Sequence, residues 1–255
     1  MSVVLTQEQR TLVADTWDFR ASAERSALLR FERLLRELRA TDAPEVICEL
    51  VERAVDDERR HIGLCDALAQ DFGWRDPPSP PTPYGPLGPQ GAKLEDRLLF
   101  ELVAFGCVTE TINVAMLLTV KKQVQDPQIR RVVSLILKDE VGHSQVGWAY
   151  LQYAYETRPI DWLSAWLPQM FEGAGVEEIY EPDSGARDVA EMAHYGELSF
   201  ADRLEVFRAA AADIIFPGLE RVALDTSACR HWLAQWEPTL GELPQGSRVL
   251  LKNQD

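Results

Sequence analysis

The sequence has no C-x-x-C pair, although it contains four cysteines: Cys48, Cys65, Cys107 and Cys229. Cysteine pairs at that spacing hold the iron of rubredoxin-type centres, so their absence argues against such a centre on this chain. Cys65 and Cys107 stand among apolar residues at helical spacing, which is typical of reduced thiols in a protein core. We therefore expect a cytoplasmic protein.

Positive charge is scarce as well. The chain carries 26 Lys and Arg against 41 Asp and Glu, a net charge of -15, which argues against nucleic acid and anionic membranes as partners. No uncharged apolar run reaches about 18 residues, so the sequence predicts no membrane span. Residues 1–10 contain no basic stretch followed by an apolar run, so we expect no signal peptide.

Proline is concentrated in residues 74–93, which contain seven of the 15 prolines. This segment cannot be a helix, and its composition is typical of a semi-rigid crossover, with a proline-recognition motif as the lesser alternative. On both sides of it apolar residues recur at intervals of three and four, which predicts two pairs of long helices and an all-α fold. The expected helices span about residues 6–39 (or 15–39), 44–72, 94–124 and 128–155.

Ionisable residues interrupt the apolar faces of these helices. Two helices carry a Glu-x-x-His motif, in which both residues share one helical face, and the other two carry a single acid in the apolar stripe. These residues are Glu58 and His61, Glu140 and His143, Glu24, and Glu110. Burying such groups without partners costs several kcal/mol, and a bound metal ion removes that cost.

Within each predicted helical pair, the two acids lie at the same distance from the turn. In an antiparallel helical pair, residues equally far from the turn lie level with each other. Glu24 and Glu58 each lie 17 residues from the first turn, and Glu110 and Glu140 each lie 15 residues from the second. At about 1.5 Å per residue, all four lie about 25 Å from their turns. The sequence thus predicts that one site collects them.

The chemistry of this set suits a pair of metal ions. Four carboxylates and two neutral imidazoles balance the charge of two divalent cations, and oxygen ligands combined with imidazole favour iron(II) or manganese(II). Carboxylates can change between terminal and bridging modes, which leaves positions for O₂. The predicted metal ligands are Glu24, Glu58, His61, Glu110, Glu140 and His143.

In these segments the chain resembles the ferritin-like di-iron carboxylate superfamily, which includes bacterioferritin, rubrerythrin and the ribonucleotide reductase small subunit. The resemblance covers roughly residues 10–156 and is specific for the superfamily rather than for one member. It implies a ferritin-like four-helix bundle with two bound irons, in which Glu58 and Glu140 are the bridging, catalytic carboxylates. It also implies an oxidase or oxygenase that uses O₂ to oxidise a small organic substrate.

Three differences from known members of the superfamily limit which of its functions this chain is expected to have. N-oxygenases of the superfamily carry an additional metal-binding His where this chain has Ile136. The radical-bearing Tyr of ribonucleotide reductases corresponds to Cys65, so a stored tyrosyl radical of that type is not expected. Storage ferritins end soon after the fourth helix, whereas this chain continues for about 100 residues.

The surroundings of the site suggest the substrate and leave alternatives open. A mostly apolar pocket, which favours an apolar or aromatic group of the substrate, is expected beside the metals. Its predicted lining is Cys107, Thr111, Val114 and Ile136. Flavin and iron–sulfur motifs are absent, so electrons are expected from an external donor.

Three functions remain as alternatives to an oxidase or oxygenase. They are a ferroxidase or iron-handling protein without a closed shell, a di-metal catalase or other non-oxygenase redox protein, and a metal-free bundle with buried salt bridges.

The remaining chain is expected to be a helical extension, residues 158–255, packed on a bundle formed by residues 1–157, in a monomer or homodimer. Its expected elements are a short helix at 159–171, a loop at 172–185, a helix at 199–216 capped by Ser199 and Asp202, a kink or end at Pro217, a short helix at 226–236 and a tail at 237–255. We expect His194 and His231 to be surface or packing residues, and the five arginines between residues 20 and 36 to lie mostly on a solvated face.

Overall fold

The computed structural model describes residues 5–82, 85–179 and 190–237, and within these ranges it contains helices and no strand. The all-α fold that the sequence predicts is therefore confirmed. The first two helices are α1, Gln7–Ala40, and α2, Glu45–Phe72, which pack closely against each other. Helix α2 ends at Gly73, whose φ of 118° lies in the left-handed region that glycine adopts readily.

The third long helix is not uniform. Helix α3, Leu94–Glu101, continues into a π-helical segment, η1, Leu102–Thr109, and then into α4, Glu110–Gln123. The sequence predicts one uninterrupted α-helix here, and this prediction is wrong over the eight residues of η1. Apolar periodicity cannot reveal the change of pitch, because every residue of η1 is buried and no polar face marks the turn.

The fourth long helix is α5, Pro127–Thr157, which begins where the side chain of Asp126 accepts hydrogen bonds from the backbone of Gln128 and Ile129. Its backbone touches that of η1 at two glycines. A Cβ atom added to Gly147 would lie 2.5 Å from backbone atoms of Gly106 and Cys107. This contact helps to close a ring in which α1 packs on α2, α2 on α5, α5 on η1 and α4, and α3 on α1.

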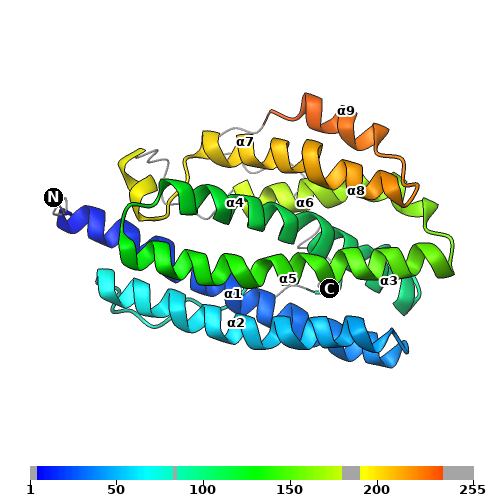
Figure 1. Ribbon diagram of the computed structural model, residues 1–255, viewed down its shortest axis with the longest axis horizontal. Coiled ribbons are helices and arrows are strands. Elements are labelled where there is room, and N and C mark those ends of the chain that lie inside the picture. Colours follow the sequence, from blue (N-terminus) through cyan, green and yellow to red (C-terminus); the bar gives the residue numbers. More distant parts are fainter. Residues whose placement is uncertain (1–4, 83–84, 180–189, 238–255) are drawn as a thin grey trace.

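The C-terminal part forms a further layer of shorter helices, in which α6 packs on η1 and α7 packs on α4. Figure 1 shows this layer on the side of α4 that faces away from α1 and α2. Its elements are η2, Asp161–Trp166, α6, Leu167–Ile179, η3, Ala190–Tyr195, α7, Phe200–Ala210, η4, Ala211–Ile215, α8, Phe216–Arg221, and α9, Ser227–Gln235.

Two expectations for this part need correction. Residues 172–179 belong to helix α6 rather than to a loop, while residues 180–185 of the predicted loop lie outside the described ranges. Of the two alternatives for Pro217, an end of the helix is wrong, because the helical run continues from α7 through the π-helical segment η4 into α8, while a kink at Pro217 stays a prediction. The side chain of Ser199 caps α7 as predicted, and the expected tail lies outside the described ranges except for Glu237.

The arginines of α1 do not all lie on a solvated face. Arg30 is only 3% exposed, and its Nε lies 3.7 Å from Oε1 of Glu101, which is also buried. Arg33 forms a second ion pair with the same carboxylate, and the backbone N–H of Leu87 donates a hydrogen bond to it. Periodicity places Arg30 outside the apolar stripe, but the ion pair with Glu101 allows its burial.

The proline-rich crossover follows α1 without forming regular structure in its described part. Three polar residues of α1, spaced four apart, hold it by hydrogen bonds. Asp18 accepts from the backbone N–H of Ser79, Ser22 donates to the carbonyl of Pro80 over 2.6 Å, and Ser26 accepts from the N–H of Thr82 over 2.8 Å. The crossover is thus fixed over one face of α1.

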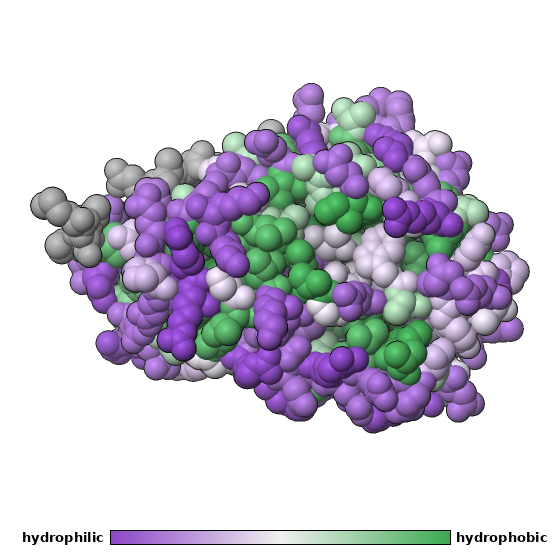
Figure 2. Space-filling view, viewed as in Figure 1, coloured by the Kyte–Doolittle hydropathy of each residue, from purple (hydrophilic) through white to green (hydrophobic). Residues whose placement is uncertain are grey.

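One helical stretch, Leu94–Gln123, is long and apolar enough to cross a membrane by length and composition alone. Its most apolar 18-residue window is 67% buried inside the protein, which fits a core helix of a soluble protein. Figure 2 shows polar side chains over most of the visible face, with smaller groups of hydrophobic residues between them.

The backbone contact at Gly147 gives a first prediction. Substituting Gly147→Ala should destabilise the protein by about 1–3 kcal/mol, because the new methyl group meets backbone atoms that cannot rotate away. Gly142→Ala is the matched control on the same helix, since nothing lies within 4 Å of its Cβ position, and it should stabilise the helix by about 0.5–1 kcal/mol. Denaturant unfolding of both variants measures the difference, and equal stabilities would contradict the close approach.

Candidate metal centre

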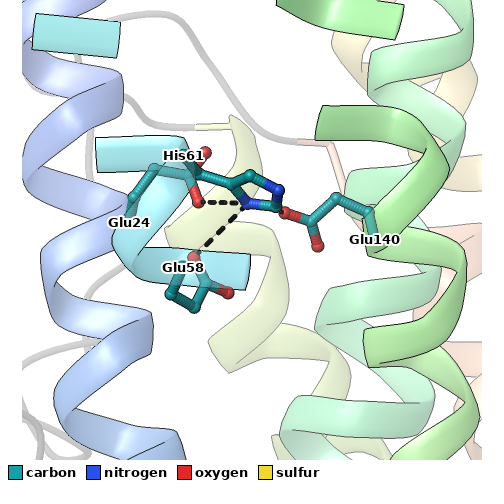
Figure 3. Close-up of side chains that lie close together, drawn as sticks. All are labelled: Glu24, Glu58, His61 and Glu140. Atoms are coloured by element: carbon teal, nitrogen blue, oxygen red, sulfur yellow. Dashed lines mark ion pairs between the residues drawn. The ribbon is translucent and has the colours of Figure 1, made fainter. Parts of the chain in front are cut away.

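The structure brings all six predicted ligands into the centre of the four long helices, and each is less than 10% exposed. Glu24 comes from α1, Glu58 and His61 from α2, Glu110 from the start of α4, and Glu140 and His143 from α5. Figure 3 shows Glu24 and Glu58 directed toward His61, with Glu140 reaching the same point from the opposite helix.

The ligand atoms form two overlapping groups. In the first group, one atom from each residue lies within 4.8 Å of the others, and the members are Glu24, Glu58, His61 and Glu140. The second group, defined by the same distance, contains Glu110, Glu140 and His143. Glu140 therefore belongs to both groups, as a ligand shared between two metal ions would.

Glu58 and Glu140 each turn one oxygen to each histidine. Nδ1 of His61 lies 3.7 Å from Oε2 of Glu58 and 3.4 Å from Oε1 of Glu140. Nδ1 of His143 lies 3.1 Å from the other oxygen of each carboxylate, Oε1 of Glu58 and Oε2 of Glu140. Both carboxylates thus span the space between the two imidazoles, which is the placement that bridging ligands require.

Three buried side-chain atoms of the six ligands have no hydrogen bond within the described residues, and one of them, Nε2 of His143, faces Asp57 at 3.5 Å. Nδ1 of His61 and Oε2 of Glu58 have no hydrogen-bond partner within the described residues, and both point into the cluster. An unsatisfied polar atom in an apolar core is costly, so these atoms need a ligand there. Oxygen and imidazole nitrogen donors suit iron(II), manganese(II) or zinc, and the residues therefore fit a metal pair.

Two aspartates support the histidines from behind, and the sequence interpretation missed both. Nε2 of His61 lies 3.3 Å from Asp139, and Nε2 of His143 lies 3.5 Å from Asp57, so each histidine meets an aspartate of the opposite helix. Arg60 donates hydrogen bonds of 2.7 Å to both aspartates. The available signal was that Asp directly precedes Glu in both motifs, which read Asp-Glu-x-x-His.

Burial in the core raises the pKa values of two of the four glutamates, Glu24 and Glu110. Burial raises the pKa of Glu24 to about 8, and the charges of Glu58 and Glu140 add to the rise, while the adjacent imidazole of His61 opposes it. Burial also raises the pKa of Glu110 well above its usual value, and the charge of Glu140 increases this effect. Burial therefore favours the protonated form of both carboxyl groups when no metal is bound.

For the two histidines, burial favours the neutral form, whereas the nearby carboxylates favour the charged form. Burial alone would lower the pKa of His61, but the adjacent carboxylates of Glu140, Glu24 and Glu58 outweigh it and raise this pKa to about 12. The pKa of His143 is likewise raised, because the charge of Glu140 outweighs burial. Burial tends to raise the pKa of Glu140, yet the two imidazolium groups hold it below its usual value. Both histidines are thus cationic without metal.

A cavity of about 150 Å³ reaches this cluster between α1 and the η1–α4 segment. Four of the six predicted ligands form part of its wall: Glu24, Glu58, Glu110 and Glu140. The third long helix contributes Phe105, Thr109 and Asn113 in addition to Glu110. The centre is therefore accessible to a small molecule from the side of α1.

The residues predicted to line the substrate pocket do not line this cavity. Cys107 and Ile136 are completely buried in the core, and the hydroxyl of Thr111 accepts a hydrogen bond from the indole of Trp148. Val114 is half-buried and packs against the core. The prediction took the apolar side of the third helix, whereas the cavity lies on the side that faces α1, where polar and aromatic residues are mixed.

The pKa values give a prediction for metal binding. Glu24, Glu110, His61 and His143 each hold a proton in the metal-free protein at neutral pH, and metal ligation displaces it. Binding of two divalent cations should therefore release about four protons per chain, and metal affinity should rise with pH. Calorimetric titration in buffers of different ionisation enthalpy measures the proton count. Release of one proton or fewer would contradict this assignment.

The aspartates give a second prediction. Asp57→Ala leaves all six ligands in place but removes the carboxylate that faces Nε2 of His143, so metal affinity should fall about 10–100-fold. Asp56→Ala is the matched control, because Asp56 is the neighbouring residue and its carboxylate is 75% exposed. Competition with a metal chelator measures both affinities, and an equal affinity of the two variants would show that Asp57 has no such role.

Comparison with protein-family profiles, with curated proteins and with solved structures gave no match. The function proposed below therefore depends on the geometry and chemistry of the centre and on the resemblance of its ligand motifs.

Proposed function

We propose that this chain is a non-haem di-iron oxidase or oxygenase built on a ferritin-like four-helix bundle, and that it uses O₂ to oxidise a small organic substrate. The observation that carries the proposal is the placement of Glu58 and Glu140, each with one oxygen toward His61 and the other toward His143. Carboxylates that span two metal ions in this way are the common feature of di-iron bundles.

The residues divide into two metal positions. Glu24 and His61 would serve one ion, Glu110 and His143 the other, and Glu58 with Glu140 would bridge both. Iron is the metal we propose, with manganese as the alternative, because both accept oxygen and imidazole ligands in open coordination. When bound, such a metal pair supplies the redox chemistry with O₂ that no protein side chain provides.

The chain's own residues fix and shield the site. Nε2 of His61 faces Asp139 and Nε2 of His143 faces Asp57, which leaves Nδ1 of each ring on the side of the cluster, where it can act as a ligand. The ring of Phe31 lies 5.3 Å from that of His143 and covers it on one side. The side chain of Cys65 is completely buried on the same face of α2 as His61. These contacts orient the ligands and exclude water from the centre.

The cavity favours an organic substrate over iron storage. A volume of about 150 Å³ beside four of the carboxylates holds a small molecule, which a ferroxidase site does not need. The ferroxidase or iron-handling function remains the second candidate, because the same ligands could bind iron as a substrate. Electrons would come from an external donor, since the sequence lacks flavin and iron–sulfur motifs.

Compartment and assembly belong to the same proposal. All four cysteines are buried and unpaired, which supports a reducing compartment and hence the cytoplasm. The net charge of -15 makes nucleic acid and anionic membranes poor partners. We propose a monomer or homodimer, which size-exclusion chromatography separates from the large shell of a storage protein.

The test of this function uses the ligands themselves. Glu58→Ala and His143→Ala should each lose about half or more of the bound iron and all oxidase activity, because each removes a ligand of the centre. Glu49→Ala on α2 and His231→Ala on α9 are matched controls, since both residues are exposed. Iron content after anaerobic loading and O₂ consumption measure the effect. Full iron and activity in the ligand variants would disprove the assignment.

The same preparation separates the alternatives. Mixing the iron-loaded protein with O₂ in a stopped-flow spectrometer should give a transient visible absorption band if the centre activates O₂. Two irons without a transient, together with turnover of excess iron(II), would favour the ferroxidase. No bound metal and no change of stability with chelator would leave a metal-free bundle.

A further inference from the structure

One of the residues that line the cavity beside the metal centre is an arginine with no carboxylate partner within the described residues. Arg20 lines the cavity and is half-buried, and its guanidinium lies 5.6 Å from the ring centre of Trp17. Within the described residues no carboxylate lies within ion-pair distance of it. Other arginines of the same helix are engaged, since Arg25 pairs with Asp66, Arg33 with Glu101, and Arg10 donates to the backbone carbonyl of Asp71.

We propose that Arg20 binds the carboxylate of a small monocarboxylic acid, and that this acid is the substrate class of the centre. The inference rests on the proposed function, because it takes the adjoining carboxylate cluster as the reactive end of the cavity. In a chain of net charge -15, a partly buried cation without an acidic partner is a position prepared for an anion.

The charge of the cavity selects a single negative charge on the ligand. The second arginine of the wall, Arg30, is already engaged, with its Nε 3.7 Å from Glu101 and its guanidinium 4.4 Å from the ring centre of Phe105. Only the charge of Arg20 is therefore available to a ligand. A carboxylate matches it, because the planar guanidinium can donate two parallel hydrogen bonds to its two oxygens.

The rest of the wall suits a compact apolar body. Phe19, Ala23, Ala27 and Phe105 supply apolar surface in the same wall. A cavity of about 150 Å³ accommodates a molecule of about the size of benzene. The ligand class is therefore a small aromatic or short aliphatic acid, whose apolar part points from Arg20 toward the buried carboxylates.

The entrance of the cavity is formed before the ligand binds. Ala23 and Thr82 are exposed residues of the wall, which places the opening between α1 and the proline-rich crossover. The hydrogen bond from the N–H of Thr82 to Ser26, and that from Ser22 to the carbonyl of Pro80, fix the crossover in this position. The ligand thus enters a site with little left to order, which favours binding.

The test measures binding of benzoate and of its neutral analogue benzamide to the full chain without metal, by ligand-observed NMR or calorimetry. Benzoate should bind more tightly than benzamide, and Arg20→Gln should weaken benzoate at least about ten-fold while leaving benzamide unchanged. Arg20→Lys should be intermediate, because the charge remains but the planar fork is lost. Arg36→Gln is the matched control, since it removes the same charge from an exposed position of α1.

The outcomes separate this inference from the proposed function. Equal affinities for benzoate and benzamide, or equal effects of the substitutions at Arg20 and Arg36, would overturn the role of Arg20 whether or not the chain binds iron. Benzoate binding that requires bound metal and survives Arg20→Gln would also overturn it, because the acid would then bind the metal directly. Selective binding in a protein that takes up no iron would support the anion site while the proposed oxidase fails.

Discussion

The structure depends on the burial of six ionisable side chains at one point in an apolar core. Four carboxylates cannot all be charged there unless positive charge lies among them. In the metal-free protein protons supply part of that charge, held by Glu24, Glu110 and the two histidines. Four protons carry the same charge as two divalent cations, so one arrangement of helices satisfies both states. Asp57 and Asp139 favour the metal-bound state, because they orient both imidazoles with Nδ1 toward the cluster.

The packing around the cluster is not the same on all sides, so a small molecule can reach the cluster from one side. Between η1 and α5, Gly106 and Gly147 meet with backbone against backbone, which leaves no room for a ligand between these two residues. Toward α1, a cavity lies between the helix and η1–α4, under a crossover fixed by hydrogen bonds. A molecule can therefore reach the carboxylates from the side of α1, where Arg20 is the charged group without an acidic partner.

The sequence predicts those features that recur along a helix and misses those that depend on its neighbours. Apolar periodicity and capping residues place the long helices, and the equal distances of Glu24 and Glu58 from their turn anticipate their meeting. The π-helical segment η1 is missed because it is buried all round. Burial of Arg30 depends on Glu101, which is 71 residues away in the chain, and no local pattern reveals it. The position of the cavity beside the carboxylates is likewise not a local property, since it depends on the packing of α1 against the third long helix.

The most direct test of a paired metal centre is crystallographic. Crystals of the chain loaded with iron(II) under nitrogen, measured at the iron absorption edge, should show two anomalous peaks between α2 and α5. One peak should lie beside Nδ1 of His61 and the other beside Nδ1 of His143, with Glu58 and Glu140 reaching both. A single peak, peaks remote from these residues, or none at all would contradict the two-metal centre.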